Sequence, residues 1–285
     1  MALGTRVKHW LNAALRPLNL RLDSLTAARA ETARQRRLAQ AGHFEHVVFP
    51  VADAMRACDP QPLFAELARH RVRMAELAQG GGDCGYRFDN EYFRSPDAEV
   101  YYALIWREQP RRIVEIGCGN STRLARQAIR DAALATELHC VDPAPRVEVA
   151  ALADRVLRDR AETLDAAALA RELAAGDFLF IDSSHEVRAG NDVLFLLLRV
   201  LPLLRPGVVV HLHDIFLPYE YPAAWVRDFD WTEQYLVQAL LQSGDRFEVL
   251  WPGHWLQRTQ PDFAAQFPHL RPGDSAQSLW LRVRR

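Results

Sequence analysis

The segment "RRIVEIGCGNSTRLARQAI", residues 111–129, constrains the fold of this chain more than any other. An apolar run ends in Glu-Ile-Gly-Cys-Gly, and a helix-like pattern follows at once. Gly117 and Gly119 permit a tight turn and let a ligand approach main-chain atoms closely. The helix that follows offers free N–H groups at its N-terminus. The segment therefore predicts a strand, a glycine turn and a helix that together bind a nucleotide-like ligand.

Short apolar segments alternate with helical patterns over the rest of the chain from residue 86, which is typical of βαβ units around a parallel sheet. The near-continuous apolar character of the first, fourth and fifth of these segments indicates strands that helices cover on both faces. The expected strands are residues 112–116, 137–141, 155–157, 178–181, 208–213, 247–251 and 279–283. The expected fold class is therefore α/β.

The first 85 residues have a different pattern and predict a helical N-terminal segment. One helix is expected over residues 24–42, starting at Ser24. Another is expected from Pro62 to Gln79, where Gly80-Gly81-Gly82 ends it. We expect two parts, residues 1–85 and the α/β domain of residues 86–285.

Residues 1–22 predict a basic amphipathic helix that Pro17 interrupts. The segment has no acid, and its basic residues are Arg6, Lys8, Arg16 and Arg21. Apolar residues recur at helical spacing, namely Val7, Trp10, Leu11, Ala14 and Leu15. Such a helix can lie on an anionic membrane surface. The alternative is a helix that packs on the domain or on a second subunit of a homo-oligomer.

Composition excludes several function classes. A formal net charge of −1 gives no global attraction to nucleic acid, so no nucleic-acid partner is expected. The four cysteines form no C-x-x-C pair, which favours reduced thiols in a cytosolic protein. No run is long and apolar enough to span a bilayer, and no signal-peptide pattern opens the chain. The expected location is cytoplasmic, and it would be peripheral at the inner membrane surface if residues 1–22 lie on the membrane.

The charges near the glycine turn favour one nucleotide over another. A dinucleotide pyrophosphate usually needs G-x-G-x-x-G, but Thr122 replaces the third glycine here. Asp142 ends the second strand, where an acid can accept hydrogen bonds from ribose hydroxyls. Glu115 would repel a pyrophosphate and attract a cationic ligand. S-adenosylmethionine, which carries an ammonium and a sulfonium, fits these charges better than NAD.

Four motifs resemble a known family. "VEIGCGNST", "VDP", "FLFIDSSHEV" and "VVVHLHDIFLPYEYP" are similar to class I S-adenosylmethionine-dependent methyltransferases of the methyltransferase 24 family, over about residues 88–250. The resemblance implies a Rossmann-like, doubly wound, seven-stranded sheet with a reversed strand near the C-terminus. It also implies that residues 86–285 are an S-adenosylmethionine-binding methyltransferase domain.

The resemblance assigns cofactor roles to residues at the strand ends. Glu115, Gly117 and Gly119 would line the methionine end, and Asp142 would hold the ribose. Glu162 would flank the adenine, unless it is a solvated loop acid. The remaining candidate cofactor contacts are Asn120, Ser121 and Asp182.

Carboxylates and imidazoles follow the fourth and fifth strands. "IDSSH" contains Asp182 and His185, and "HLHD" contains His211, His213 and Asp214. Methyl transfer to oxygen needs a nucleophile without its proton, and either a histidine base or a divalent cation achieves this. The alternatives are that Asp182 caps the next helix and that one histidine of "HLHD" is structural.

This layout resembles the metal-dependent sugar and catechol O-methyltransferases, whose acids at these strand ends bind the ion. In the sugar enzymes a histidine three residues after the first acid is the base, and His185 has that spacing. The candidate catalytic residues are His185, Asp182 and Asp214, and the candidate ligands of Mg²⁺ or Mn²⁺ are Asp182, His213 and Asp214. His213 replaces a carboxylate of those enzymes, so a softer ion or no metal stays open.

Aromatic residues near these motifs are candidate acceptor contacts. Phe216, Tyr219 and Tyr221 are expected over the cleft, or else in ordinary loop packing. Residues before the sheet are expected to close over the donor, namely Asn90, Tyr92 and Phe93.

The expected function is S-adenosylmethionine-dependent O-methylation of a small hydroxylated acceptor, such as a sugar, glycan or related metabolite. N-methylation is an alternative within the same fold. A NAD-binding oxidoreductase and a non-catalytic binding protein of the methyltransferase fold are the alternatives from other classes.

Overall fold

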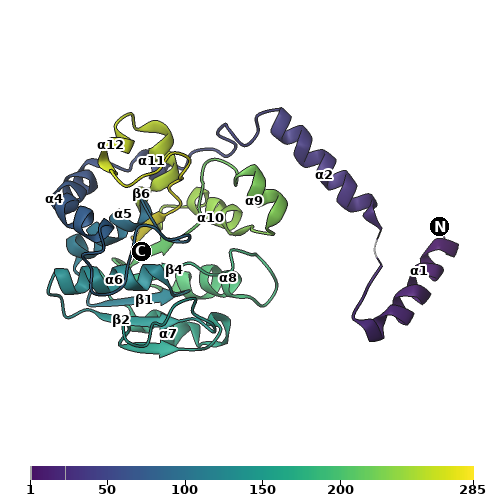
Figure 1. Cartoon of the computed structure of the whole chain (residues 1–285), viewed down its shortest axis with the longest axis horizontal. Coiled ribbons are helices and arrows are strands. Elements are labelled where there is room, and N and C mark those ends of the chain that lie inside the picture. The colour runs from purple at the N-terminus through teal and green to yellow at the C-terminus, as the bar shows by residue number, and fades with distance from the viewer. Residues whose placement is uncertain (1, 23) are drawn as a thin grey trace.

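Seven short and largely buried strands form the centre of the molecule (Figure 1). They are β1 (Arg112–Ile116), β2 (Glu137–Val141), β3 (Arg155–Leu157), β4 (Phe178–Ile181), β5 (Val209–Leu212), β6 (Phe247–Pro252) and β7 (Leu279–Val283). All seven strands are where the sequence predicts them, within one residue at each end. This computed structural model describes residues 2–22 and 24–285, and the side chains from residue 7 onward.

The strand order is β3-β2-β1-β4-β5-β7-β6. The pairs from β3 to β5 are parallel, whereas β7 runs antiparallel to both β5 and β6. This topology confirms the predicted doubly wound, seven-stranded sheet and its reversed strand. The order reverses between β1 and β4, and ligands of open α/β sheets bind at such a point.

Alternate residues of the central strands face two separate cores. Ile113, Phe178 and Phe180 belong to a core that α4 (Gln61–Ala78), α5 (Asp97–Glu108) and α6 (Asn120–Asp131) cover. Val114, Leu179 and Ile181 face a second core on the other side of the sheet. The helices that cover this second face are α7 (Ala166–Glu172), α8 (Asp192–Phe195) and α10 (Glu233–Gln242). Burial on both faces explains why these strands read as almost continuous apolar runs.

The other helical elements are short. They are α3 (Asp53–Arg56), η2 (Ala161–Thr163), η3 (Leu196–Val200), η4 (Leu201–Leu203), α9 (Ala223–Asp228), α11 (Gly253–Thr259) and α12 (Phe263–Gln266). Helix α4 is close to its predicted bounds, and it packs its apolar side on α5 within the core of the domain. The core therefore continues across residue 85.

The N-terminal residues form an arm that extends away from the body of the molecule (Figure 1). Helix α1 (Ala2–Leu15) is followed by the single turn η1 (Arg16–Leu18), and α2 (Leu25–Gln40) joins the arm to the body. The Ser24 hydroxyl accepts a hydrogen bond from the Thr26 N–H and caps α2, as its position in the sequence predicts. Met1 and the Arg6 side chain lie outside the described part of the predicted basic segment. Among the described residues, no helix has the length and hydropathy needed to cross a membrane.

Candidate active site

Gly117 ends β1 in a conformation that favours glycine. Its φ is +84°, and a Cβ atom there would overlap the carbonyl oxygen of Asp182. The two segments are this close because the Asp182 N–H donates to the Ile116 carbonyl at 2.9 Å. Gly119, the N-cap of α6, has an extended φ of −179° and open space around a Cβ. Only the first glycine is therefore required by the shape of the turn.

Asp142, directly after β2, ties two loops together. One carboxylate oxygen accepts the Cys118 N–H at 2.9 Å, and the other accepts the Ala144 N–H at 2.8 Å. Each carboxylate oxygen has a second lone pair, so both can accept a further hydrogen bond. Asp142 is therefore rigidly placed beside the glycine turn and still has acceptor capacity for a ligand.

Glu115 lies behind the turn and is fully buried. Its carboxylate accepts the Thr122 hydroxyl at 2.5 Å and the Tyr101 hydroxyl at 3.1 Å. Burial raises the pKa of Glu115 to about 7, although these hydrogen bonds and that of Ser121 oppose the shift. Thr122 also accepts the Gly119 N–H at 3.0 Å, so Glu115 holds the turn through Thr122.

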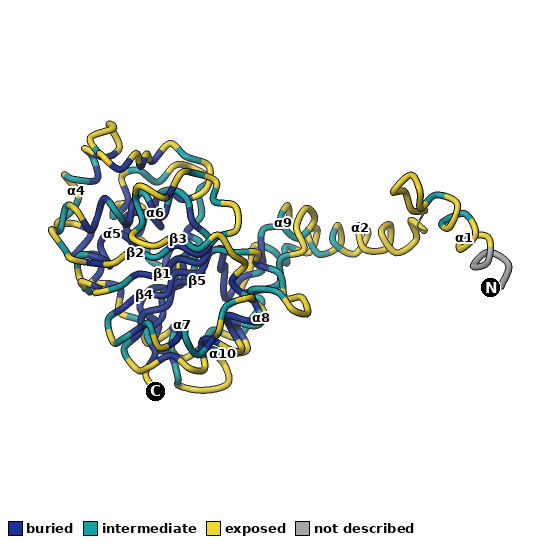
Figure 2. Tube along the Cα trace, turned by 90° about the horizontal axis from the view of Figure 1, so that it is seen from below, coloured by how far each residue is buried: buried dark blue, intermediate teal, exposed yellow. Residues whose placement is uncertain are grey.

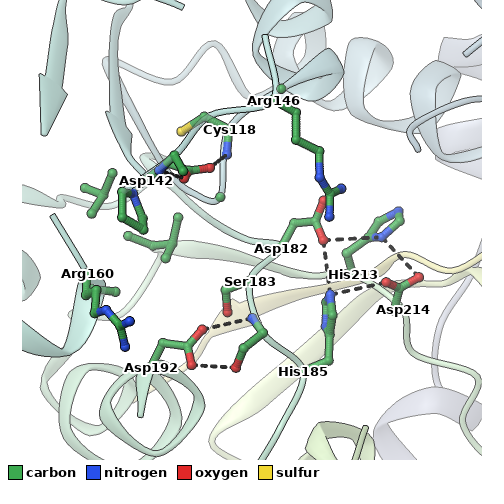
Figure 3. A pocket seen from close by; sticks show the side chains of 18 of the residues that line it. Cys118, Asp142, Arg146, Arg160, Asp182, Ser183, His185, Asp192, His213 and Asp214 are labelled. Carbon is green, nitrogen blue, oxygen red and sulfur yellow. Dashed lines mark hydrogen bonds and ion pairs between the residues drawn. The ribbon is translucent and has the colours of Figure 1, made fainter. Parts of the chain in front are cut away.

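A cavity of 1310 Å³ opens at the ends of β1, β2, β4 and β5 (Figure 3). Every predicted cofactor residue except Glu115 lines it: Gly117, Gly119, Asn120, Ser121, Asp142, Glu162 and Asp182. Three residues expected to close over the donor also line it: Asn90, Tyr92 and Phe93. The Asn120 amide donates to the Asn90 side chain at 3.2 Å, which joins this upstream segment to α6.

Four charged side chains converge at one end of the cavity (Figure 3). His185 Nε2 lies 3.3 Å from an Asp182 oxygen and 3.2 Å from an Asp214 oxygen. His213 Nδ1 lies 3.4 Å from Asp214 and 3.8 Å from Asp182. The structure therefore brings together all the residues that the sequence proposes for catalysis.

Glu233 supports this cluster from behind and is not evident in the sequence. It begins α10, is fully buried, and its carboxylate oxygen lies 2.9 Å from His185 Nδ1. The His185 carbonyl accepts the N–H groups of Thr232 and Glu233 at 2.8 and 3.0 Å. His185 is thus held by its ring and by its backbone, with Nε2 directed at the two aspartates.

Two members of the cluster have backbone conformations that are costly for residues other than glycine. His185 has a φ of +59° and Asp214 a φ of +57°. Such conformations cost on the order of 1 kcal/mol or more each and concentrate at functional sites. The fold tolerates this strain at the two residues whose side chains face each other.

The charges of the cluster stabilise one another. Burial disfavours a charged His185, but Asp182, Asp214 and Glu233 outweigh it and raise the pKa of His185 well above its ordinary value. Burial likewise opposes the charge on His213, yet Asp214 and Asp182 raise the pKa of His213 to about 9. Burial disfavours ionised Asp182 too, but His213 and His185 hold its pKa well below the ordinary value. The neighbouring carboxylates therefore favour the protonated, charged form of both histidines.

The group of potential metal ligands contains His185, whereas the sequence proposes His213 beside the two aspartates. The ligand atoms of Asp182, His185 and Asp214 all lie within 4.8 Å of one another, and these residues form a group that could hold a metal ion. His213 lies next to this group.

Two alternatives raised by the sequence are resolved. Asn191, not Asp182, is the N-cap residue of the following helix, α8. His211 does not line the cavity and is structural, since it stacks on Phe180 at 3.9 Å and lies 2.9 Å from the Ser278 hydroxyl.

The aromatic wall of the cavity comes from a different loop than the sequence suggests. Phe216, Tyr219 and Tyr221 are buried and do not line the cavity, so the expectation of ordinary loop packing holds for them. Phe229 and Trp231 line it instead, with stacked rings 4.7 Å apart. Trp231 also lies 4.5 Å from the ring of His185, which places an aromatic surface beside the charged cluster.

Residues 114–215 match the family model described as "Methyltransferase domain". The match begins within β1 and ends just after β5, and it confirms the resemblance to methyltransferases over these residues. No curated protein matches the chain.

Three solved structures illustrate the similarity. A methyltransferase of Podospora anserina bound to SAH has 17% identity and a TM-score of 0.43, covering 93% of this chain and 98% of that one. An O-methyltransferase from Bacillus cereus in complex with SAH has 15% identity and a TM-score of 0.41, covering 79% and 91%. Cofactor-bound Rv0187 from MTB has 18% identity and a TM-score of 0.41, covering 80% and 91%.

Proposed function

We propose that this chain is an S-adenosylmethionine-dependent methyltransferase that methylates a hydroxyl oxygen of a small acceptor, such as a sugar, glycan or related metabolite. One observation carries the proposal. A single cavity has the glycine turn and Asp142 at one end, and Asp182, His185 and Asp214 at the other. The first end suits a nucleoside and the second suits removal of a proton, which are the two requirements of methyl transfer to oxygen.

The cofactor would bind along the strand ends. Asp142 has free acceptor positions for the ribose hydroxyls. The turn at Gly117 leaves main-chain atoms open to the methionine part. Glu115 supplies negative charge behind the turn, and a cationic ligand would favour its ionised form despite its raised pKa.

His185 would accept the proton of the acceptor. The acceptor oxygen attacks the methyl carbon while the carbon–sulfur bond breaks, and the hydroxyl proton passes to His185 Nε2. His185 must first lose the proton that the neighbouring carboxylates favour on it. In the neutral imidazole, Glu233 accepts the Nδ1–H, and this selects the tautomer whose Nε2 is free to take the proton. The products are a methyl ether, S-adenosylhomocysteine and a protonated histidine that returns its proton to water. Because neighbouring carboxylates raise the pKa of His185, turnover should increase as pH rises.

The same cluster suits Mg²⁺ or Mn²⁺, since two carboxylates and an imidazole converge within 4.8 Å. Asp182 and Asp214 would hold the ion, with His185 or His213 beside it. A cation bound there would lower the pKa of the acceptor hydroxyl and offset the carboxylate charge that keeps a proton on His185.

Phe229 and Trp231 support a ring-shaped acceptor. Their stacked rings line the cavity beside His185, and aromatic faces suit the apolar face of a sugar. An acceptor lying on this wall would present its hydroxyl to the charged cluster.

Calorimetric titration tests the proposal. We expect S-adenosylhomocysteine to bind in the micromolar range and NAD to give no heat. Titration with Mn²⁺ should give heat in the wild type and none in Asp214→Asn if the cluster holds a cation. Binding of NAD instead would favour an oxidoreductase, and binding of neither nucleotide would favour a non-catalytic protein of this fold.

A further inference from the structure

We propose that residues 2–22 bind an anionic membrane surface and tether the body of the enzyme to it. This inference does not use the cofactor cavity, and it holds or fails independently of the proposed reaction.

Among the residues of α1 whose side chains the structure describes, the apolar side is not buried. Trp10 is 71% exposed and Val7 is 51% exposed. Leu11, Ala14 and Leu15 continue the same helical spacing, and none of the residues 7–22 is buried. A helix of this length is marginal in water on its own, so α1 needs a surface that covers its apolar side.

The residues after α1 extend this apolar surface. The Asn12 side chain donates to the Leu22 carbonyl at 2.9 Å and accepts the Leu22 N–H at 2.6 Å, so the chain folds back on α1. Leu18, Leu20 and Leu22 are between 48% and 68% exposed. Of the fourteen exposed large apolar side chains in the described part of the molecule, five fall within residues 7–22. Such a concentration indicates an interaction surface and not scattered exposure.

The positive charge of residues 1–22 favours a partner with a negatively charged surface. Residues 1–22 contain four basic residues and no acid, whereas the rest of the chain contains 31 basic and 36 acidic residues. An amphipathic helix with basic residues and an exposed Trp suits a headgroup region that carries negative charge. A second copy of the segment would bring like charges together, which disfavours a dimer through α1.

Helix α2 separates this surface from the body (Figure 2). It has 16 residues, none of them buried, so it spans about 24 Å. Its surface is mostly polar, with Arg34 and Glu31 paired at 2.6 Å. Among the described residues, its hydrogen bond to the body is that of the Gln35 amide with the Val226 carbonyl, at 3.3 Å. Helix α2 could therefore act as a spacer. It would hold the cavity near the membrane surface while the body stays outside the lipid.

Vesicle flotation of the full-length protein tests this inference. The probes are vesicles of phosphatidylcholine alone and vesicles with roughly 30 mol% phosphatidylglycerol. We expect the wild type to float only with the anionic vesicles. Trp10→Glu should weaken binding about tenfold or more, because it places a charge on the apolar side. Arg16→Gln should weaken it about fivefold through the lost charge. The matched control is Val72→Glu, at an α4 side chain that is 74% exposed, and it should float as the wild type does.

Three results would overturn the inference: no flotation of the wild type, equal flotation with neutral vesicles, or unchanged flotation of Trp10→Glu. A wild-type dimer that Trp10→Glu converts to a monomer in light scattering, without vesicle binding, would assign the surface to a second copy instead. Unchanged S-adenosylhomocysteine affinity in the variants shows that they remain folded and separates this test from that of the reaction.

Discussion

At Gly117 the chain passes so close to the Asp182 carbonyl that a methyl group has no room. We expect Gly117→Ala to lower the free energy of unfolding by about 3 kcal/mol or more, from overlap and from strain at φ of +84°. Gly119→Ala is the matched control, since its Cβ meets nothing, and it should cost about 1 kcal/mol or less. Urea unfolding of both variants measures the difference. Equal losses would mean that the turn relaxes around the added methyl group.

Asp142 is predicted to bind the ribose with its remaining lone pairs. Asp142→Ala should weaken S-adenosylhomocysteine binding by roughly 1–3 kcal/mol, because hydrogen bonds to a charged acceptor are lost. Calorimetry measures the affinity, with Asp159→Ala as a control at a nearby exposed acid that does not line the cavity. Unchanged affinity in Asp142→Ala would remove the ribose assignment.

Glu99 gives the stability of the protein a pH dependence that can be isolated. Its carboxyl is buried with the Ser95 hydroxyl as its partner, and burial raises the pKa of Glu99 to about 8, with a small contribution from Asp97. Above the unfolded pKa of 4.5, the unfolded chain loses this proton while the folded protein keeps it. The contribution of Glu99 to the free energy of unfolding is therefore greatest below pH 4.5. It decreases as pH rises toward 8, by at most about 1.4 kcal/mol per pH unit.

Glu99→Gln should remove this contribution. Relative to the wild type, the variant should become more stable as pH increases from about 5 to 8. Denaturant unfolding of both proteins across this range measures the difference between them. A constant difference would mean that Glu99 ionises at its ordinary pKa.

At the scale of elements, the start of helix α10 places the Glu233 carboxylate beside His185 Nδ1, on the side of the ring away from the aspartates. Glu233→Gln removes a negative charge 2.9 Å from Nδ1, so the pKa of His185 should fall. Histidine NMR of the metal-free protein measures this pKa. At a pH high enough to deprotonate His185 in both proteins, turnover should decrease about 10–100-fold, because the ring loses the carboxylate that orients it. Tyr235→Phe on the same helix is the control, since its hydroxyl binds Glu220 outside the cluster. An unchanged pKa would mean that the His185–Glu233 contact is not an ion pair in solution.

The sequence predicts the strands well because of how they are buried. Helices on both faces require near-continuous apolar runs in β1, β4 and β5, and such runs are visible without any knowledge of pairing. The ends of these strands, with Gly117, Asp142, Asp182 and Asp214, were predictable for the same reason.

The rest of the site depends on tertiary contacts that local patterns do not record. Glu233 lies 48 positions from His185 and is one acid among many at a helix start. The sequence left open whether Phe216 lines the cavity or packs within the loop, and it packs 5.1 Å from Trp225 of α9. Phe229 and Trp231, which follow α9, line the cavity instead. The sequence shows that a loop is rich in aromatic residues. Which of their rings remain accessible to a ligand depends on the helix that packs over the loop.

At the scale of the whole molecule, we expect the arm and the body to be nearly independent in stability, although α2 contacts α9. Deletion of residues 1–41 removes α1 and α2, neither of which has a buried side chain among its described residues. We expect the melting temperature to change by less than about 4 °C and the cofactor affinity to be unchanged. Differential scanning calorimetry and S-adenosylhomocysteine titration measure the two quantities. A large loss of stability would show that the arm packs on the body in solution.

The position of β7 has a consequence for how the protein is made. In space β7 lies between β5 and β6, but in the chain it follows both. While the polypeptide emerges from the ribosome, β6 has no neighbour and the edge of β5 stays open until Leu279–Val283 has been synthesised. The parallel strands that carry the cofactor turn can pair earlier. The order of translation therefore allows the nucleotide site to form on a nascent chain whose sheet is still incomplete, and exposes an unpaired strand edge to chaperones for as long as synthesis of the last strand takes.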